Sequence, residues 1–178
     1  MAEGPRSTCL VFIYREGAFS AMGHDLKLEV TGFTVEVGEG QAVRANARTD
    51  SLRVVGSLRG DGTVDEREPA PRDRQEIERT IAREILEAER FPQAAFRSTS
   101  VVAEGDRYRI AGLLDLHGAV KDMSLTAERK GDRAVARFPL NQLDFRIKPY
   151  RAMLGALRVK PVVEVEVSVA LPAGQGRS

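Results

Sequence analysis

The feature that most constrains this chain is a period of two, in which apolar and polar residues alternate through most of its length. The clearest segment is residues 162–170, VVEVEVSVA, where valine occupies every second position. Residues 26–30, 43–47 and 107–116 repeat the pattern. Alternation of this kind is expected of a β-strand with one buried face. The sequence therefore predicts an all-β fold built on an antiparallel sheet.

The phase of this alternation changes at Gly32. Before the glycine, Leu26, Leu28 and Val30 share one face of the predicted strand, and after it residues 33–37 carry the apolar face at Phe33 and at the valines that follow. A glycine at such a change indicates a bulge or a sharp bend, which is how a sheet turns a barrel corner. We therefore expect a corner at Gly32.

Residues 72–90 depart from the period of two and predict one amphipathic helix. Isoleucine recurs at every fourth position, at Ile77, Ile81 and Ile85. This spacing places the three side chains on one helical face. Asp73 with Glu76 three residues later resembles a capping box, which predicts that the helix begins there. Pro92 lies just beyond its expected end.

Length and charge limit the classes of protein to which the chain can belong. A chain of 178 residues predicts one domain, residues 1–172, followed by a disordered tail at 173–178. The 27 basic and 26 acidic residues give a net charge of +1, which argues against nucleic-acid binding. The single cysteine, Cys9, excludes an internal disulfide framework and a cysteine zinc site.

The sequence predicts neither a membrane-spanning segment nor an export signal. No apolar stretch approaches the roughly 20 residues that span a bilayer. The first residues, MAEGPRSTCLVFIY, carry an early acid and a proline, and their apolar run breaks at Arg15. We therefore expect no transmembrane segment and a cytoplasmic protein.

An antiparallel sheet hides its edges fully when it closes into a barrel. A barrel of about eight strands can either fill its interior with side chains or hold one small ligand. The chain has no tryptophan, and aromatic residues make up only 6% of it. Small residues occupy several predicted inward positions, namely Ala45, Ala47, Gly112, Ala134 and Ala136. This favours a cavity, although a flattened barrel or the packed helix would absorb the same room.

Two segments of the sequence resemble the YceI-like family of lipocalin-like barrels. They are residues 85–101, ILEAERFPQAAFRSTSV, and residues 106–125, DRYRIAGLLDLHGAVKDMSL. The matching residues are Phe91, Pro92, Phe96, Ser98, Thr99, Gly112, Leu114, Leu116, His117, Gly118 and Lys121. The resemblance covers roughly residues 8 to 170. It implies an extended antiparallel β-barrel with one helix.

The resemblance also implies a function. It predicts a long apolar tunnel that takes an isoprenoid chain, such as a polyprenyl or quinone-type lipid, for non-catalytic binding, carriage or sequestration. The expected ligand contacts are Phe12, Tyr14, Leu26, Leu28, Phe33, Phe96, Ile110, Leu114, Leu116 and Val165, with His24 and His117. The alternative is that the apolar members of this set simply pack against one another. A homodimer that buries apolar faces between two barrels stays open.

The two histidines, His24 and His117, allow two interpretations. They could pair across the barrel mouth, with Asp25 or Asp115 orienting an imidazole, and bind a lipid head group or a metal as in an enzyme. Alternatively, a histidine beside a glycine at a turn donates to a backbone carbonyl and fixes the bend. The second interpretation is favoured, so we predict no metal, no cofactor and no catalytic residue.

Two further features carry weaker signals. Cys9 lies in an apolar segment, which is typical of a small core residue rather than a nucleophile. Residues 145–161, FRIKPYRAMLGALRVKP, interleave basic and apolar side chains. This segment could be a mobile basic flap that guides an anionic head group, or a long hairpin with a solvated face. The hairpin is the favoured interpretation.

Overall fold

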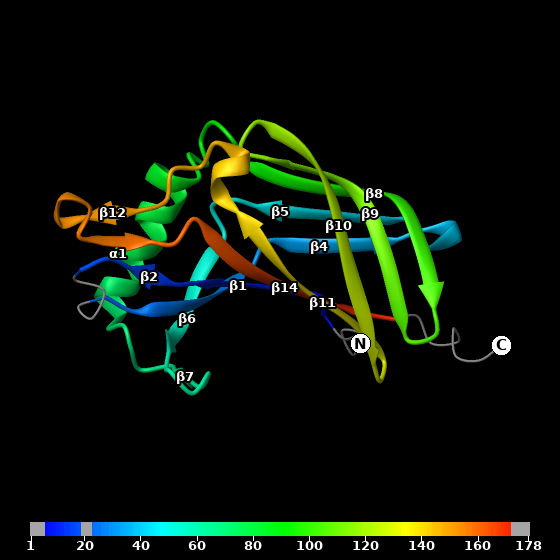
Figure 1. The fold of residues 1–178 in the computed structure, drawn as a ribbon, viewed down its shortest axis with the longest axis horizontal. Helices are drawn as coiled ribbons and strands as arrows, with labels where there is room; N and C mark the ends of the chain where they lie inside the picture. The colour runs from blue at the N-terminus through cyan, green and yellow to red at the C-terminus, as the bar shows by residue number, and fades with distance from the viewer. Residues whose placement is uncertain (1–5, 19–22, 172–178) are drawn as a thin grey trace.

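The computed structural model describes residues 6–18 and 23–171, which form a strongly curled antiparallel sheet with one helical segment (Figure 1). Neighbouring strands follow the order β4-β5-β8-β9-β10-β11-β14-β1-β3-β6-β7. Their bounds are β1 Thr8–Ile13, β3 Asp25–Val30, β4 Phe33–Val37, β5 Val43–Arg48, β6 Leu52–Leu58, β7 Val64–Asp65, β8 Gln93–Glu104, β9 Arg107–Leu116, β10 Ala119–Lys130, β11 Arg133–Asn141 and β14 Val162–Ala170. The predicted all-β barrel class is confirmed.

A bent hairpin joins the two halves of the sheet. β3 and β4 form one strand interrupted at residues 31–32, and β5 and β6 form its partner, interrupted at residues 49–51. The β3 half pairs with β1, whereas the β5 half pairs with β8. Since the two halves border opposite sides of the sheet, the bend brings the sheet round on itself.

Gly32 lies at this bend, as the change of phase predicts. The amide of Arg48 donates to the Gly32 carbonyl at 3.0 Å, so the two strands stay joined through the corner. A Cβ atom on Gly32 would lie 2.9 Å from Oγ of Ser51, which leaves no room for a side chain. Leu28 before the bend and Phe33 after it both face the interior.

The helical segment packs at one end of the barrel (Figure 1). It consists of α1 (Pro71–Thr80) and a π-helical turn, η3 (Ile81–Ile85). Ile77 and Ile81 pack against the core of β3 and β6, so the predicted apolar face is confirmed. The predicted capping box at Asp73 is wrong, because the helix begins at Pro71 and no side chain caps it. Proline suits the first helical position, whose N–H needs no partner within the helix.

A second sheet of three short strands lies at the same end as the helix (Figure 1). It orders β12 (Arg151–Ala152), β13 (Leu157–Val159) and β2 (Arg15–Glu16). Short 3-10 turns flank or connect these strands, namely η4 (Gln142–Phe145) and η5 (Met153–Gly155), and a third, η2 (Glu39–Gln41), links β4 to β5. The basic segment 145–161 therefore contains the hairpin favoured by its sequence.

Two predictions about the end of the domain concern residues that the structure does not describe. The predicted disordered tail, residues 173–178, lies outside the described residues, and the single-domain boundary at residue 172 stays a prediction. Within residues 6–18 and 23–171, none of the helices combines the length and the apolar character needed to cross a membrane.

Candidate ligand-binding cavity

The barrel encloses a cavity of about 610 Å³. Its walls come from the inward side chains of the strands and from the apolar face of the helical segment. Eight apolar residues expected from the sequence line it, namely Leu26, Leu28, Phe33, Phe96, Ile110, Leu114, Leu116 and Val165. The cavity therefore collects these side chains in one space, while their contact with a ligand stays a prediction.

The interior of the barrel is not filled by its own side chains. Leu28 is the single large side chain that is fully buried within the described part of the chain. Ile110, Leu125 and Val165 point into the barrel, yet each stays only half-buried because it faces the cavity. Protein interiors are normally packed with few voids larger than a water molecule. The small inward residues were compatible with a cavity or with an interior filled by a flattened barrel or by the helix. The structure has the cavity.

Gly112 contributes to packing rather than to this space. A Cβ atom on Gly112 would lie 2.5 Å from Cζ of Phe96 and 2.4 Å from the Arg97 carbonyl oxygen. The aromatic ring of Phe96 therefore covers the glycine and occupies the room that a small residue leaves. Alanines 45, 47 and 134 remain at the cavity wall and are half-buried.

Phe12 and Tyr14 lie outside the cavity, so the inward orientation expected for them is wrong. Phe12 is 8% exposed because the guanidinium of Arg137 stacks on its ring, 4.4 Å from the centroid. The Tyr14 hydroxyl donates to Glu164 at 3.3 Å, and burial together with this carboxylate raises the pKa of Tyr14. The cavity side of β1 instead carries Cys9, Val11 and Ile13.

His117 holds a turn and does not line the cavity. It is 7% exposed, with φ +51°, at the β9–β10 turn. Its Nδ1 lies 3.2 Å from the Phe145 carbonyl oxygen and its Nε2 lies 3.0 Å from a carboxylate oxygen of Glu87. The ring also packs on Phe91, with the two centroids 4.4 Å apart. His117 thus ties the turn to η4 and to the segment after the helix, as the structural interpretation predicts.

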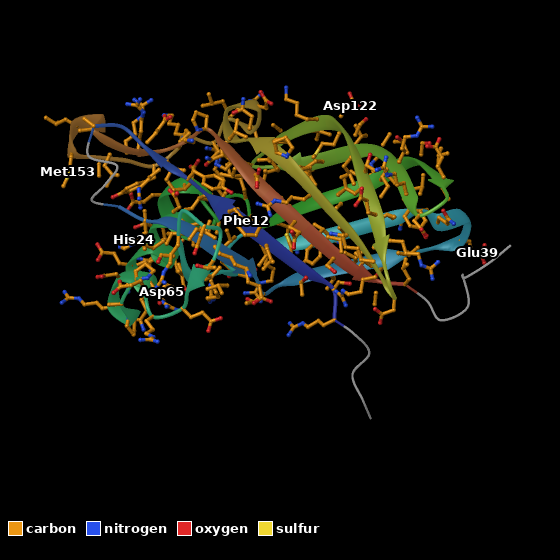
Figure 2. The ribbon with its side chains drawn as sticks, turned by 60° about the horizontal axis from the view of Figure 1, so that its bottom comes forward. Phe12, His24, Glu39, Asp65, Asp122 and Met153 are labelled. Carbon is orange, nitrogen blue, oxygen red and sulfur yellow. The ribbon has the colours of Figure 1, made fainter. Side chains whose placement is uncertain are left out.

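His24 lies at one end of the cavity and is exposed. Figure 2 places it at the same end as Met153, opposite Glu39 at the tip of the β4–β5 hairpin. The alternative interpretation, in which the two histidines pair at the barrel mouth, is not supported, since His24 lines the cavity and His117 does not. Asp25, expected to orient an imidazole, accepts instead from the Arg15 amide at 2.8 Å. Asp115, the other expected partner, is an exposed strand residue.

Polar groups are a minority of the cavity lining and occur on β5 and the bend after it, on the helix, and at both ends; those outside the ends include Asn46, Arg48, Thr49, Asp73, Glu76 and Thr80. At the end near His24 the lining includes Arg15, Tyr150 and Arg158, and the last two are exposed. At the opposite end it includes Gln41 beside the exposed Val37. A wall that is mostly apolar and carries few polar groups suits a ligand that is largely hydrocarbon.

Cys9 and the acidic residues offer little reactive chemistry. Burial raises the pKa of the Cys9 thiol to about 12, so it stays protonated at neutral pH and is a poor nucleophile. In residues 6–18 and 23–171, the His, Cys, Asp and Glu side chains form no group of three that could hold a metal ion.

The chain matches the family described as the YceI-like domain over residues 15–171. It belongs to the YceI-like family. A curated relative, protein YceI of Salmonella arizonae, is 48% identical over 48 residues, which are 27% of this chain and 25% of that protein. Protein YceI of Salmonella newport matches to the same extent. The matched segment therefore spans only a quarter of the curated relatives' length.

Several solved structures share the fold of this chain at low sequence identity. BcnA of Burkholderia cenocepacia has a TM-score of 0.63 at 13% identity, covering 91% of this chain and 94% of its own. A polyisoprenoid binding domain from Saccharophagus degradans has a TM-score of 0.55 at 10% identity, covering 91% and 95%. The YceI protein of Campylobacter jejuni has a TM-score of 0.54 at 13% identity, covering 82% and 84%.

Sequence reasoning missed some residues of this YceI-like cavity. The inward face of β10 carries Met123, Leu125 and Ala127, whose alternation with polar residues was available as a signal. By contrast, nothing in the sequence pairs Glu87 with His117, since 30 residues separate them.

Proposed function

We propose that this protein binds a long apolar isoprenoid-type lipid, such as a polyprenyl or quinone-type lipid, inside its barrel. The protein acts as a carrier or a sequestering protein and not as an enzyme. The observation that carries the proposal is the unfilled apolar cavity of about 610 Å³. A structural neighbour described as a polyisoprenoid binding domain supports it, as does membership of the YceI-like family.

The apolar wall is sufficient to hold such a lipid. A long isoprenoid chain exposes several hundred square ångströms of apolar surface in water, and burial of that surface is worth on the order of 10 kcal/mol. Association and ordering offset part of this gain. Useful affinity therefore needs no charged anchor inside the barrel, and the polar end groups can serve specificity.

The arrangement of the reactive side chains supports a non-catalytic role. His117 is held by Phe145 and Glu87 outside the cavity. The Cys9 thiol is protonated at neutral pH because burial raises its pKa to about 12. His24 lies at one end of the cavity without the second histidine that the enzyme alternative requires.

Two tryptophan variants test the proposal. Val165→Trp places a large ring in the cavity. Thr126→Trp places the same ring on the outer, solvent-exposed face of β10. Because the chain has no tryptophan of its own, the emission of each introduced residue reports whether it is shielded from water. Urea unfolding of both variants shows that each is folded.

The readout is native mass spectrometry of the purified full chain, before and after addition of a long-chain polyprenol, with solvent extraction to identify the adduct. We expect one lipid per chain in the wild type and in Thr126→Trp, and loss of the lipid in Val165→Trp. Equal lipid binding by the folded Val165→Trp variant would place the ligand outside the cavity. Failure of the wild type to bind polyprenol or any co-purified apolar lipid would overturn the proposal.

A further inference from the structure

Most of the exposed large apolar side chains lie in one stretch of the chain. Eight large apolar residues are exposed within the described residues, and five of them lie in residues 143–162, here called the docking segment. These five are Leu143, Tyr150, Met153, Leu154 and Val162. Contiguous exposed apolar surface on a protein marks a site of interaction. The docking segment contains the β12–β13 hairpin, whose tip carries Met153 (Figure 2).

The tip of this hairpin carries Leu154, a leucine that does not contribute to the stability of the fold. Leu154 is fully exposed and has φ +57°, and its neighbour Met153 is 51% exposed with φ +52°. Bulky side chains are disfavoured in this left-handed backbone region, where glycine, asparagine and aspartate are the usual residues. Neither burial nor backbone preference favours leucine at position 154. We therefore expect the Leu154 side chain to contact another molecule.

Basic residues surround these apolar side chains. The docking segment carries Arg146, Lys148, Arg151, Arg158 and Lys160 against a single acid, Asp144, a net charge of +4 in a chain whose total is +1. All five basic side chains lie on exposed residues. Arg158 pairs with Glu16 at 2.8 Å, and none of the described carboxylates lies within salt-bridge distance of the other four. The segment therefore combines five of the eight exposed large apolar side chains of the described residues with a net positive charge.

We propose that the docking segment binds the surface of an anionic phospholipid membrane. Leu154 and Met153 enter the boundary between head groups and acyl chains, and the four cations that lack a carboxylate partner contact the anionic head groups. Apolar insertion and electrostatic attraction together give stable but reversible membrane binding. Each basic residue near an anionic bilayer strengthens binding about fivefold.

The position of the docking segment links this surface to the cavity. Tyr150 and Arg158 belong to the segment and also line the end of the cavity where His24 lies. Docking would therefore bring that end to the membrane, and an apolar chain could pass between bilayer and barrel without crossing water. This use of the surface rests on the proposed function, whereas membrane binding itself does not.

Vesicle flotation of the lipid-free full chain tests the inference, with vesicles of phosphatidylcholine alone and of phosphatidylcholine mixed with phosphatidylglycerol. We expect binding to the mixed vesicles, weakened by added salt. Leu154→Asp should weaken it about tenfold or more, because it removes the inserted side chain and suits the left-handed backbone. The matched control is Val102→Asp, which changes an exposed valine on β8 and should leave binding unchanged.

Charge is tested separately. The double variant Lys148→Gln/Arg151→Gln should weaken binding to mixed vesicles about 30-fold. Arg44→Gln/Arg97→Gln removes the same charge from exposed positions on β5 and β8 and should have no such effect.

Equal binding to both kinds of vesicle, or equal effects of the variants and their controls, would overturn the inference. Absence of vesicle binding would overturn it as well, and would favour an acidic protein partner for this surface. Native mass spectrometry keeps this result distinct from failure of the lipid proposal, since Leu154→Asp should still carry its lipid.

Discussion

Two leucine-to-alanine substitutions distinguish a hollow barrel from a packed one. Leu28 borders the cavity but is fully buried in a cluster with Leu26 and Val54, against which the helix packs. Its truncation leaves an unfilled space among close-packed neighbours, so we expect Leu28→Ala to lower the free energy of unfolding by about 3–5 kcal/mol. Leu125 also points inward, but it faces the cavity and is only half-buried. Truncation there enlarges an existing cavity, and Leu125→Ala should cost only about 1 kcal/mol.

The assay is urea unfolding at 25 °C of protein freed of lipid, for the wild type and both variants. Saturation with a long-chain polyprenol should then stabilise the wild type by about 2.7 kcal/mol at a hundredfold excess over Kd. Leu125→Ala should gain less from the lipid than Leu28→Ala does, because Leu125 is half-buried and open to the cavity, whereas Leu28 borders the cavity but is fully buried by its neighbours. Equal losses for the two variants in lipid-free protein would show that Leu125 is as closely packed as Leu28. That result would refute the hollow interior.

Three further predictions concern single residues. His117→Ala removes the contacts of the imidazole with the Phe145 carbonyl and with one oxygen of the Glu87 carboxylate. It should lower stability by about 1–3 kcal/mol in urea unfolding while lipid binding persists, and loss of lipid at unchanged stability would contradict a structural role. Gly112→Ala collides with a packed aromatic ring and should cost about 1–3 kcal/mol, so an unchanged Tm would contradict that packing. Burial raises the pKa of the Cys9 thiol from about 9 to about 12, so above pH 9 the unfolded chain loses a proton that the folded chain keeps. The stability of the wild type relative to Cys9→Ala should therefore fall by up to about 1.4 kcal/mol per pH unit between those values, and a flat difference would contradict a buried thiol.

The fold could be predicted from the sequence wherever alternation was clear. Leu26 and Leu28 alternate with charged residues, so the pattern alone assigned their inward face correctly. The corner at Gly32 was predictable because the change of phase and the glycine coincide. The helical face at Ile77 and Ile81 followed from its own spacing.

The pattern failed where each residue of a strand is apolar. Residues 9–14, CLVFIY, give no polar positions that would mark the outer face, and the two aromatic rings made the wrong face look favourable. Phe12 lies outside because Arg137, distant in sequence, covers its ring. The role of His117 likewise depends on Glu87 and Phe145, which only the folded chain brings beside it. Contacts of this kind have no local signature.

The central claim is that an apolar chain lies inside the barrel. A crystal structure of the full chain grown with a long-chain polyprenol tests it most directly. We predict continuous elongated density within the cavity, in contact with Ile110, Leu125 and Val165. Density for the lipid only on the outer surface, or an interior closed by the protein's own side chains, would contradict the claim.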